Sequence, residues 1–306
     1  MKSPGLFKVL RRTAGDFAAD DCMSSAAALS YYTVFSLPAL LVLIMLLVGS
    51  VMDPADVRGG LARQIESLMG AGAATEVRSL LEKAEQPGGG ALPTVLGILA
   101  LLFGATGAVI QLQATLDRVW GVKSVGGGIR GFLMKRVFSL AMILALAFFL
   151  LVSLLVSAAL AAFGSRLEGL GIPAPLLLAL NFVVTFAVIA AIFAAMFKFL
   201  PDARTSWQDV RIGAAFTAGL FMVGKFLIGF YLGRSNPGEA YGAAGSLALL
   251  LVWIYYSSII VLFGAEFTET WAEERGAGVE PKEGAVRVRR VVEEEGGHPE
   301  RSEGSA

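Results

Sequence analysis

Six long apolar blocks dominate this 306-residue chain and limit the folds open to it. They cover about residues 29–52, 92–113, 137–163, 174–199, 210–232 and 243–268. An α-helix rises 1.5 Å per residue, so about 20 apolar residues cross the roughly 30 Å hydrocarbon core of a bilayer. Each block is long enough, and 56% of all residues are hydrophobic while only 16% are charged. The sequence therefore predicts an all-α integral membrane protein, a bundle of six transmembrane helices.

The lysines and arginines are divided unevenly among the segments that connect the blocks. Eighteen of the 25 lie in the N-terminal segment, the second and fourth connections and the C-terminal tail, whereas six lie in the other connections. Connections rich in Lys and Arg remain in the cytoplasm. We therefore expect a multi-pass protein whose N-terminus and C-terminus are both cytoplasmic.

Three segments lie outside the apolar blocks of the transmembrane domain, which we place at residues 29–271. Residues 1–28 carry apolar residues at helical spacing among Lys and Arg, which predicts an amphipathic helix that lies in the membrane interface or packs on the cytoplasmic face. Residues 53–91 carry two apolar stripes, which predict an external helical hairpin, either a structural cap or a lid. Residues 272–306 are charged and poor in large apolar residues, so we expect a disordered cytoplasmic tail.

Lys225 is the one lysine or arginine in the interior of an apolar block, since Lys198 and Arg211 lie at the ends of theirs. It follows Arg211 by 14 positions, which places it about 21 Å above the cytoplasmic edge. A lysine in hydrocarbon costs about 2.5–3.5 kcal/mol on insertion scales, so it should face the protein interior or water. It either contacts an anionic substrate or headgroup, or extends outward to the interface. The other substrate-binding candidates are polar residues of the spans: Gln111, Tyr31, Tyr32 and Tyr231.

Other residues in the blocks predict how the helices pack. Pro38 lacks a backbone donor and should kink the first span. Glu266 lies near the cytoplasmic end of the sixth span, where we expect an arginine such as Arg118 or Arg136 to neutralise it. The glycines of the second and fifth blocks favour close approach of neighbouring helices.

Several classes of function find no support in the sequence. One cysteine, Cys22, and one histidine, His298, leave no ligand set for a zinc or copper site. Gly126–Gly128 connects two predicted helices, so it is not a phosphate-binding loop between strand and helix. The formal net charge is zero, which gives no overall attraction to nucleic acid. We expect a protein that is not an enzyme, with no cofactor, no metal and no nucleic-acid partner; its partners are membrane lipids, and its oligomeric state stays open.

Short motifs occur in a fixed order along the blocks. They read ALSYYTVFSLP at 28–38, LDRVW at 116–120, FKFLPD at 197–202, YGAAGS at 241–246 and WIYYS at 253–257, followed by Gly264-Ala265-Glu266. Together they cover about residues 5–270 and resemble the YihY/BrkB family of bacterial inner-membrane proteins, formerly labelled ribonuclease BN. The positions that we take from these motifs as structural are Pro38, Asp117, Arg118, Trp120, Pro201, Gly242, Trp253 and Glu266.

The resemblance implies a six-helix protein of the bacterial inner (plasma) membrane with a loosely defined activity in envelope biology. We interpret the chain as a transporter or flippase-like protein for an anionic envelope lipid or related solute. The alternative is a non-catalytic membrane scaffold for envelope machinery. A tRNA-processing ribonuclease is the least favoured function, because phosphodiester cleavage needs a histidine or a metal-bound water and His298 lies by itself in the tail.

Overall fold

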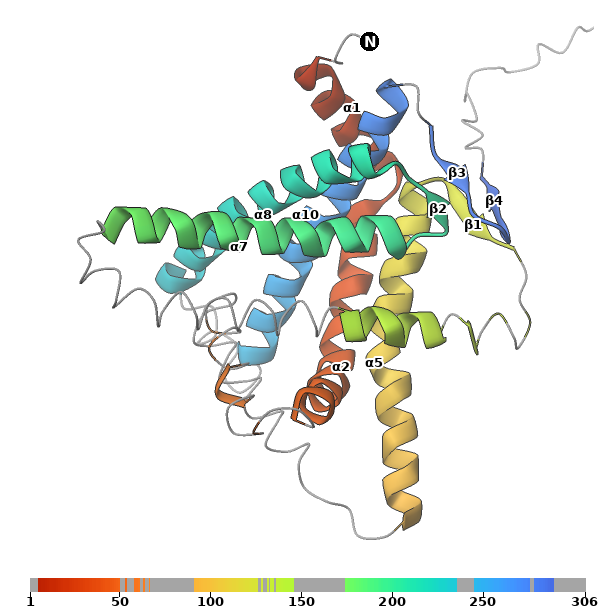
Figure 1. Cartoon of the computed structure of the whole chain (residues 1–306), viewed down its shortest axis with the longest axis vertical. Coiled ribbons are helices and arrows are strands. Elements are labelled where there is room, and N and C mark those ends of the chain that lie inside the picture. The colour runs from red at the N-terminus through yellow and green to blue at the C-terminus, as the bar shows by residue number, and fades with distance from the viewer. Residues whose placement is uncertain are drawn as a thin grey trace, which may run out of the picture.

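The computed structural model describes residues 5–49, 53, 58–60, 63, 66, 91–125, 128, 131, 133, 134, 136–145, 174–235, 245–275 and 278–288. Long helices make up most of this part of the chain (Figure 1). They are α1 (Leu6–Ala19), α2 (Cys22–Gly49), α5 (Ala91–Val119), α7 (Ala174–Phe199), α8 (Trp207–Ser235) and α10 (Gly245–Glu274). Four short strands accompany them: β1 (Val122–Ser124), β2 (Ala203–Arg204), β3 (Glu280–Pro281) and β4 (Ala285–Arg287). The predicted helical class is confirmed.

Three of the described helices are long and apolar enough to cross a membrane. These segments are Ala179–Phe199, Trp207–Ile228 and Leu247–Glu274. Within the third expected span, the described helix is Arg136–Ala145. The expected hairpin at 53–91 is described only at isolated positions, and Gly242 lies outside the described residues. The count of six spans and the hairpin therefore stay predictions.

The first long helix begins earlier than the sequence predicts. α2 starts at Cys22 rather than near residue 29, directly after a tight turn in which Asp21 has a φ of 49°. Aspartate tolerates this left-handed conformation better than most residues, and the Asp21 carboxylate accepts a 2.8 Å hydrogen bond from Ser24 Oγ. The turn lets α1 fold back and pack against α10.

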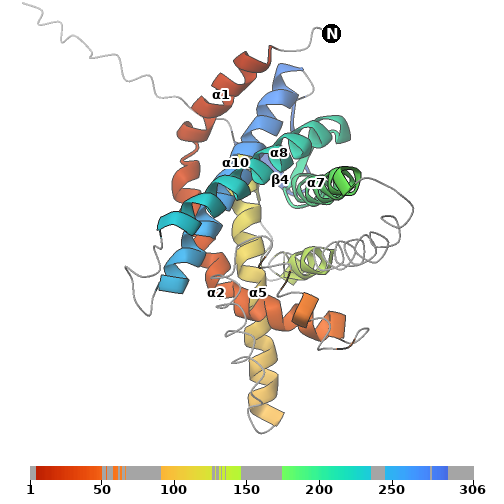
Figure 2. The same ribbon diagram turned by 90° about the vertical axis from the view of Figure 1, so that its left-hand side faces the viewer.

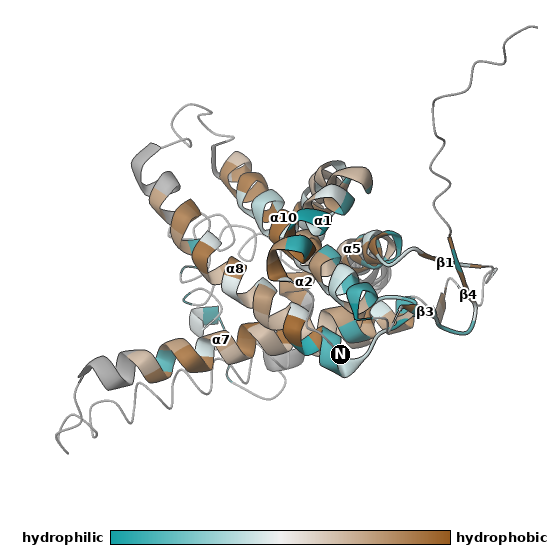
Figure 3. Cartoon of the chain, turned by 90° about the horizontal axis from the view of Figure 1, so that it is seen from above, coloured by the Kyte–Doolittle hydropathy of each residue, from teal (hydrophilic) through white to brown (hydrophobic). Residues whose placement is uncertain are grey.

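The described helices do not run as a simple parallel bundle. α2 packs along α5 and against α10, α10 packs against α8, and α8 packs against α7. α7 lies crosswise to α5, since it is seen from the side in Figure 1 and end-on in Figure 2 while α5 stays upright in both. Figure 2 also shows that α2 changes direction along its length, as expected for a helix that contains Pro38. Apolar residues dominate the length of α7 and α8 (Figure 3).

Two glycine–threonine pairs hold α8 against α10. A Cβ atom added to Gly213 of α8 would lie 1.8 Å from Thr268 Oγ1, and one added to Gly264 of α10 would lie 1.9 Å from Thr217 Oγ1. Each threonine hydroxyl donates to a carbonyl of its own helix, Thr217 to Gly213 at 2.7 Å and Thr268 to Gly264 at 2.6 Å. The hydroxyls are thus satisfied, and the two backbones approach as closely as these side chains allow.

The second expected span also packs through its glycines. Cβ atoms at Gly104 and Gly107 of α5 would lie 3.3 Å from Ala39 Cβ and Ser36 Oγ of α2. The prediction that glycines form packing surfaces is confirmed for these positions and for Gly213. It is wrong for Gly219, where a Cβ atom would meet no described atom within 4 Å.

The four strands gather at one end of the molecule, which we call the strand end. β1 pairs with β4 and β2 pairs with β3, both antiparallel. The expectation of a disordered tail from residue 272 is therefore wrong for residues 278–288, and α10 itself continues to Glu274. The strands of the tail are two or three residues long, and their backbone partners come from loops far away in sequence. Local composition carries little signal for such pairing.

Replacing Gly264 with alanine is expected to destabilise the protein by about 1–3 kcal/mol, as overpacking does in other cores. The new Cβ atom would lie 2.8 Å from Thr217 Cβ as well as 1.9 Å from its hydroxyl, so a side-chain rotation does not relieve the overlap. Gly219→Ala on α8 is the matched control and should not lower stability. Thermal unfolding in detergent measures both variants, and equal midpoints would contradict the close crossing.

Ending the chain at Gly276 is expected to lower the unfolding temperature more than ending it at Val288. The first truncation removes β3 and β4 with their pairing to β2 and β1, whereas the second keeps all four strands. The two truncated proteins are compared with the full chain by thermal unfolding in the same detergent. A truncation at Gly276 that melts like the full chain would show that the strands add nothing to stability.

Candidate functional site

Two sequence motifs meet at the strand end through a buried hydrogen-bond network. Asp117, at the end of α5, accepts a 2.7 Å hydrogen bond from the backbone N–H of Asp202. Asp202 Oδ1 in turn accepts one from Gln113 at 3.3 Å. Lys282 of the tail donates to the carbonyls of Pro201 at 2.6 Å and Phe199 at 3.3 Å. These contacts join α5, the α7–α8 connection and the tail.

Lys282 is the cation in this network. Burial lowers the pKa of Lys282 from its ordinary value, although the Asp202 and Asp117 carboxylates act in the opposite direction. Its ammonium group donates to carbonyl oxygens. These oxygens are uncharged, so they do not neutralise the positive charge of the lysine. The arrangement joins α5, the α7–α8 connection and the tail, so we assign it a structural role.

The tryptophans taken from the motifs are both buried. Trp120 is 2% exposed and packs edge-on against Phe197, with ring centroids 5.9 Å apart. Trp253 is 4% exposed and packs against Phe221 at 6.0 Å. The Trp120 indole N–H has no hydrogen-bond partner among the described residues.

Glu266 is completely buried, and its surroundings differ from those expected. Its Oε1 atom accepts from the Cys22 thiol at 3.4 Å, and the carboxyl group of Asp20 lies close to it. The arginines expected there bind elsewhere: Arg118 donates to Ser25 at 3.2 Å, and Arg136 donates to a threonine of α5. The expectation of an arginine beside Glu266 is wrong because the turn between α1 and α2 brings Asp20 and Cys22 to this position instead.

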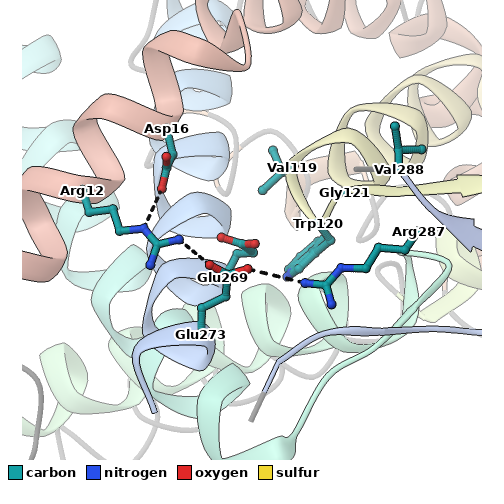
Figure 4. Close-up of a pocket in the computed structure, with 9 residues that line it drawn as sticks. All are labelled: Arg12, Asp16, Val119, Trp120, Gly121, Glu269, Glu273, Arg287 and Val288. Atoms are coloured by element: carbon teal, nitrogen blue, oxygen red, sulfur yellow. Dashed lines mark hydrogen bonds and ion pairs between the residues drawn. The ribbon is translucent and has the colours of Figure 1, made fainter. Parts of the chain in front are cut away.

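A charged cavity of about 690 Å³ lies beside this cluster, among α1, the end of α5, the end of α10 and β4 (Figure 4). Its lining residues are Arg12, Asp16, Val119, Trp120, Gly121, Glu269, Glu273, Arg287 and Val288. Figure 4 shows the carboxyl groups of Glu269 and Glu273 between Arg12 on one side and Trp120 and Arg287 on the other.

Ion pairs neutralise most of the cavity wall. Arg12 pairs with Asp16 at 3.4 Å and with Glu273. Glu273 is also approached by Arg287, at 3.6 Å. Glu269 lies close to the Glu273 carboxyl group and within electrostatic range of Arg12, but the structure shows no close ion pair from it to a described lysine or arginine.

Sequence reasoning missed this cavity, because its residues come from both ends of the chain. Arg12 and Asp16 are four positions apart on α1, and Glu269 and Glu273 are four apart on α10. Such spacing places each pair on one face of its helix. That signal was present, but nothing in the sequence indicates that α1 folds against α10.

Lys225 lies on α8, inside the apolar segment Trp207–Ile228. Its side chain is half-buried, and among the described residues none forms a hydrogen bond or ion pair with its ammonium group. Its neighbours Val223, Phe226 and Leu227 are 60%, 73% and 55% exposed. The structure thus places Lys225 at the border between packed helix and an apolar outer surface.

The other substrate-binding candidates do not gather around Lys225. Tyr31 and Tyr32 are exposed on α2 and pack against each other at 5.8 Å. Gln111 is half-buried on α5. The described parts of α2 and α5 have no extensive contact with α8, and the side chain of Tyr231 lies outside the described residues.

Comparison with known proteins identifies relatives of this chain. The Virulence factor BrkB family matches residues 13–289. A UPF0761 membrane protein of Psychrobacter sp. (strain PRwf-1) is 28% identical over 269 residues, which are 86% of this chain and 48% of the relative. One from Alkalilimnicola ehrlichii is 32% identical over 264 residues, 84% of this chain and 56% of the relative. The chain thus spans about half the length of the curated relatives it matches.

No solved structure matches the chain. The match across residues 13–289 covers nearly all of the described elements, from α1 to β4. Its relatives are named as membrane proteins, in agreement with the apolar helices α7, α8 and α10. The chain is therefore a membrane protein that belongs to the Virulence factor BrkB family.

Proposed function

We propose that this protein moves an anionic envelope lipid, or a solute of related chemistry, across the bacterial inner membrane. The observation that carries the proposal is the half-buried ammonium group of Lys225 in an apolar membrane helix, without a described hydrogen-bond or ion-pair partner. A charged residue in such a segment is costly and typically marks a substrate or ion pathway. The proposal requires no chemical reaction and no cofactor.

The surroundings of Lys225 favour a lipid over a small hydrophilic solute. The exposed side chains of Val223, Phe226 and Leu227 form an apolar surface next to it. In a bilayer such a surface faces acyl chains. A lipid whose headgroup passes Lys225 could keep its tails in the hydrocarbon, whereas a soluble ion would need an enclosed path.

The uneven distribution of Lys and Arg supports an orientation with the strand end in the cytoplasm. Lys225 follows Trp207 by 18 positions on α8, about 27 Å along the helix axis, so it would lie in the outer half of the membrane. α1 would then rest at the inner surface. Its buried Val9 and Thr13 face the protein, while Phe7 is 81% exposed and free to enter the interface.

Replacing Lys225 with glutamine is expected to slow the transfer of a fluorescent phosphatidylglycerol in proteoliposomes about tenfold, or about 1.4 kcal/mol in the barrier. Lys225→Arg should retain most of the rate, because it keeps the cation. Lys123→Gln, at the exposed position of β1, is the matched control and should transfer lipid like the unaltered protein.

Full transfer by a stably folded Lys225→Gln protein would contradict the role of this residue. An unaltered protein that transfers no lipid would contradict the proposed function and favour the non-catalytic scaffold. Deleting residues 54–86 would then test the scaffold, since a scaffold that uses the external segment loses its partner in pull-down experiments.

A further inference from the structure

The charged cavity at the strand end has no part in the proposed transfer past Lys225. Lysine and cavity lie on different elements, since the cavity is lined from α1, α5, α10 and β4 and not from α8. Its volume of about 690 Å³ is within the range of small-molecule sites, about 300–1,000 Å³. The polar groups of its wall show what chemistry it would accept.

The acidic side of the wall favours a cation. Arg12 is fully engaged, because its three nitrogens pair with Asp16, Glu273 and Glu274. The lining holds three carboxyl groups and two guanidinium groups. Glu269 is the carboxyl group of the lining that forms no close ion pair with a described residue, and Arg12 acts on it only from a longer distance. A primary ammonium group beside it would supply both the charge and N–H donors.

The opposite side of the wall favours an anion. The Trp120 indole can only donate a hydrogen bond; it is 2% exposed and has no described acceptor. A buried donor left without an acceptor destabilises the fold, and an acceptor supplied by a ligand removes that cost. Arg287 lines the same cavity, and the distance from its Nη2 atom to Glu273 is 3.6 Å, longer than a hydrogen bond. An oxyanion placed here would accept from both.

We propose that this cavity binds a zwitterion with a phosphate group next to a primary ammonium group. The phosphate accepts from Trp120 and Arg287, and the ammonium donates to Glu269. The chemistry is that of phosphoethanolamine, either free or as a lipid headgroup. Glu269 and Glu273 lie at the end of the apolar segment Leu247–Glu274, at the depth where a bilayer places its headgroups.

Simpler ligands fit the wall less well. Inorganic phosphate leaves Glu269 without a cation and adds negative charge to a wall that already has an excess of carboxyl groups. A quaternary ammonium has no N–H to donate. A metal ion has no set of ligands here, since the described residues include no cluster of three His, Cys, Asp or Glu side chains suited to one.

Titration calorimetry of the full chain in a sugar detergent tests the proposal with O-phosphoethanolamine as the probe. We expect saturable binding, and binding at least about tenfold weaker for phosphocholine and inorganic phosphate. A second arm measures retention of phosphatidylethanolamine against phosphatidylcholine by native mass spectrometry. Selectivity in either arm supports the site, and the arm that shows it identifies the free or the lipid-borne source. No selectivity in both arms overturns the proposal.

Paired variants assign the binding to the cavity. Trp120→Phe removes the N–H and keeps a ring, and it should weaken binding about tenfold. Trp271→Phe is its control, because the Trp271 indole also lacks a described partner but does not line the cavity. Glu269→Gln should weaken binding similarly, with exposed Glu283→Gln as its control.

The proposal fails if both cavity variants bind like the unaltered protein, or if the controls lose binding equally. If Trp120→Phe disturbs folding, the test uses the binding affinity of Glu269→Gln and the preference of the unaltered protein for O-phosphoethanolamine over phosphocholine. Neither result bears on lipid transfer past Lys225, which is measured with a phosphatidylglycerol that has no ammonium group.

Discussion

The arrangement of the helices depends on the reciprocal contact between Gly213–Thr217 of α8 and Gly264–Thr268 of α10. Each glycine faces the threonine of the other helix, and neither position has room for another carbon atom. This contact fixes α8 on α10, and through α8 it also fixes α7, which packs on α8. Lys225 lies about two turns beyond Thr217 on the same helix, so its position follows from the crossing. Interactions of this kind need no polar group in the hydrocarbon, because the hydroxyls are satisfied within their own helices.

The strand end provides a second anchor, built from polar groups. The Asp117 carboxylate accepts a hydrogen bond from the backbone N–H of Asp202. Lys282 donates a hydrogen bond to the carbonyl of the preceding residue, Pro201. This network ties the tail to α5 and to the connection between α7 and α8. It also brings β4 against the end of α5, where Val288 N–H donates to Gly121 O at 2.8 Å. The ordered tail therefore supplies one wall of the charged cavity, through Arg287 and Val288.

Sequence patterns predicted the features that depend on length and local composition. The expected span 174–199 coincides with α7, since apolar length alone defines it. Gly104, Gly107 and Gly213 lie at helix contacts, as small residues in membrane helices usually do. Contacts between distant segments were not predictable. The Asp20–Glu266 contact depends on the left-handed turn at Asp21, and a single aspartate gives no indication of which helix its neighbours will meet.

The cavity is the extreme case of this limit. Arg12 and Glu273 are 261 positions apart, and Trp120 reads in the sequence as one more buried aromatic residue. Only the fold shows that its N–H is unsatisfied beside charged groups. Lys225, in contrast, was found from the sequence because a lysine within an apolar block is costly wherever its neighbours lie. Sequence patterns thus identify residues, such as Lys225, whose burial in the membrane is energetically unfavourable wherever their neighbours lie. They miss residues, such as Trp120, whose role depends on which distant segments pack around them.

The packing also restricts which helices can move relative to one another. α8 and α10 are locked by the glycine–threonine pairs, and α2 and α5 are joined by Gly104 and Gly107, so each pair should move as one body. The contact between the pairs is of another kind. α2 meets α10 through longer side chains, such as Met23 with Tyr255 and Cys22 with Glu266. Side chains of this sort can change rotamer without separating two backbones. Relative motion is therefore expected between the α2–α5 pair and the α8–α10 pair, and not within either of them.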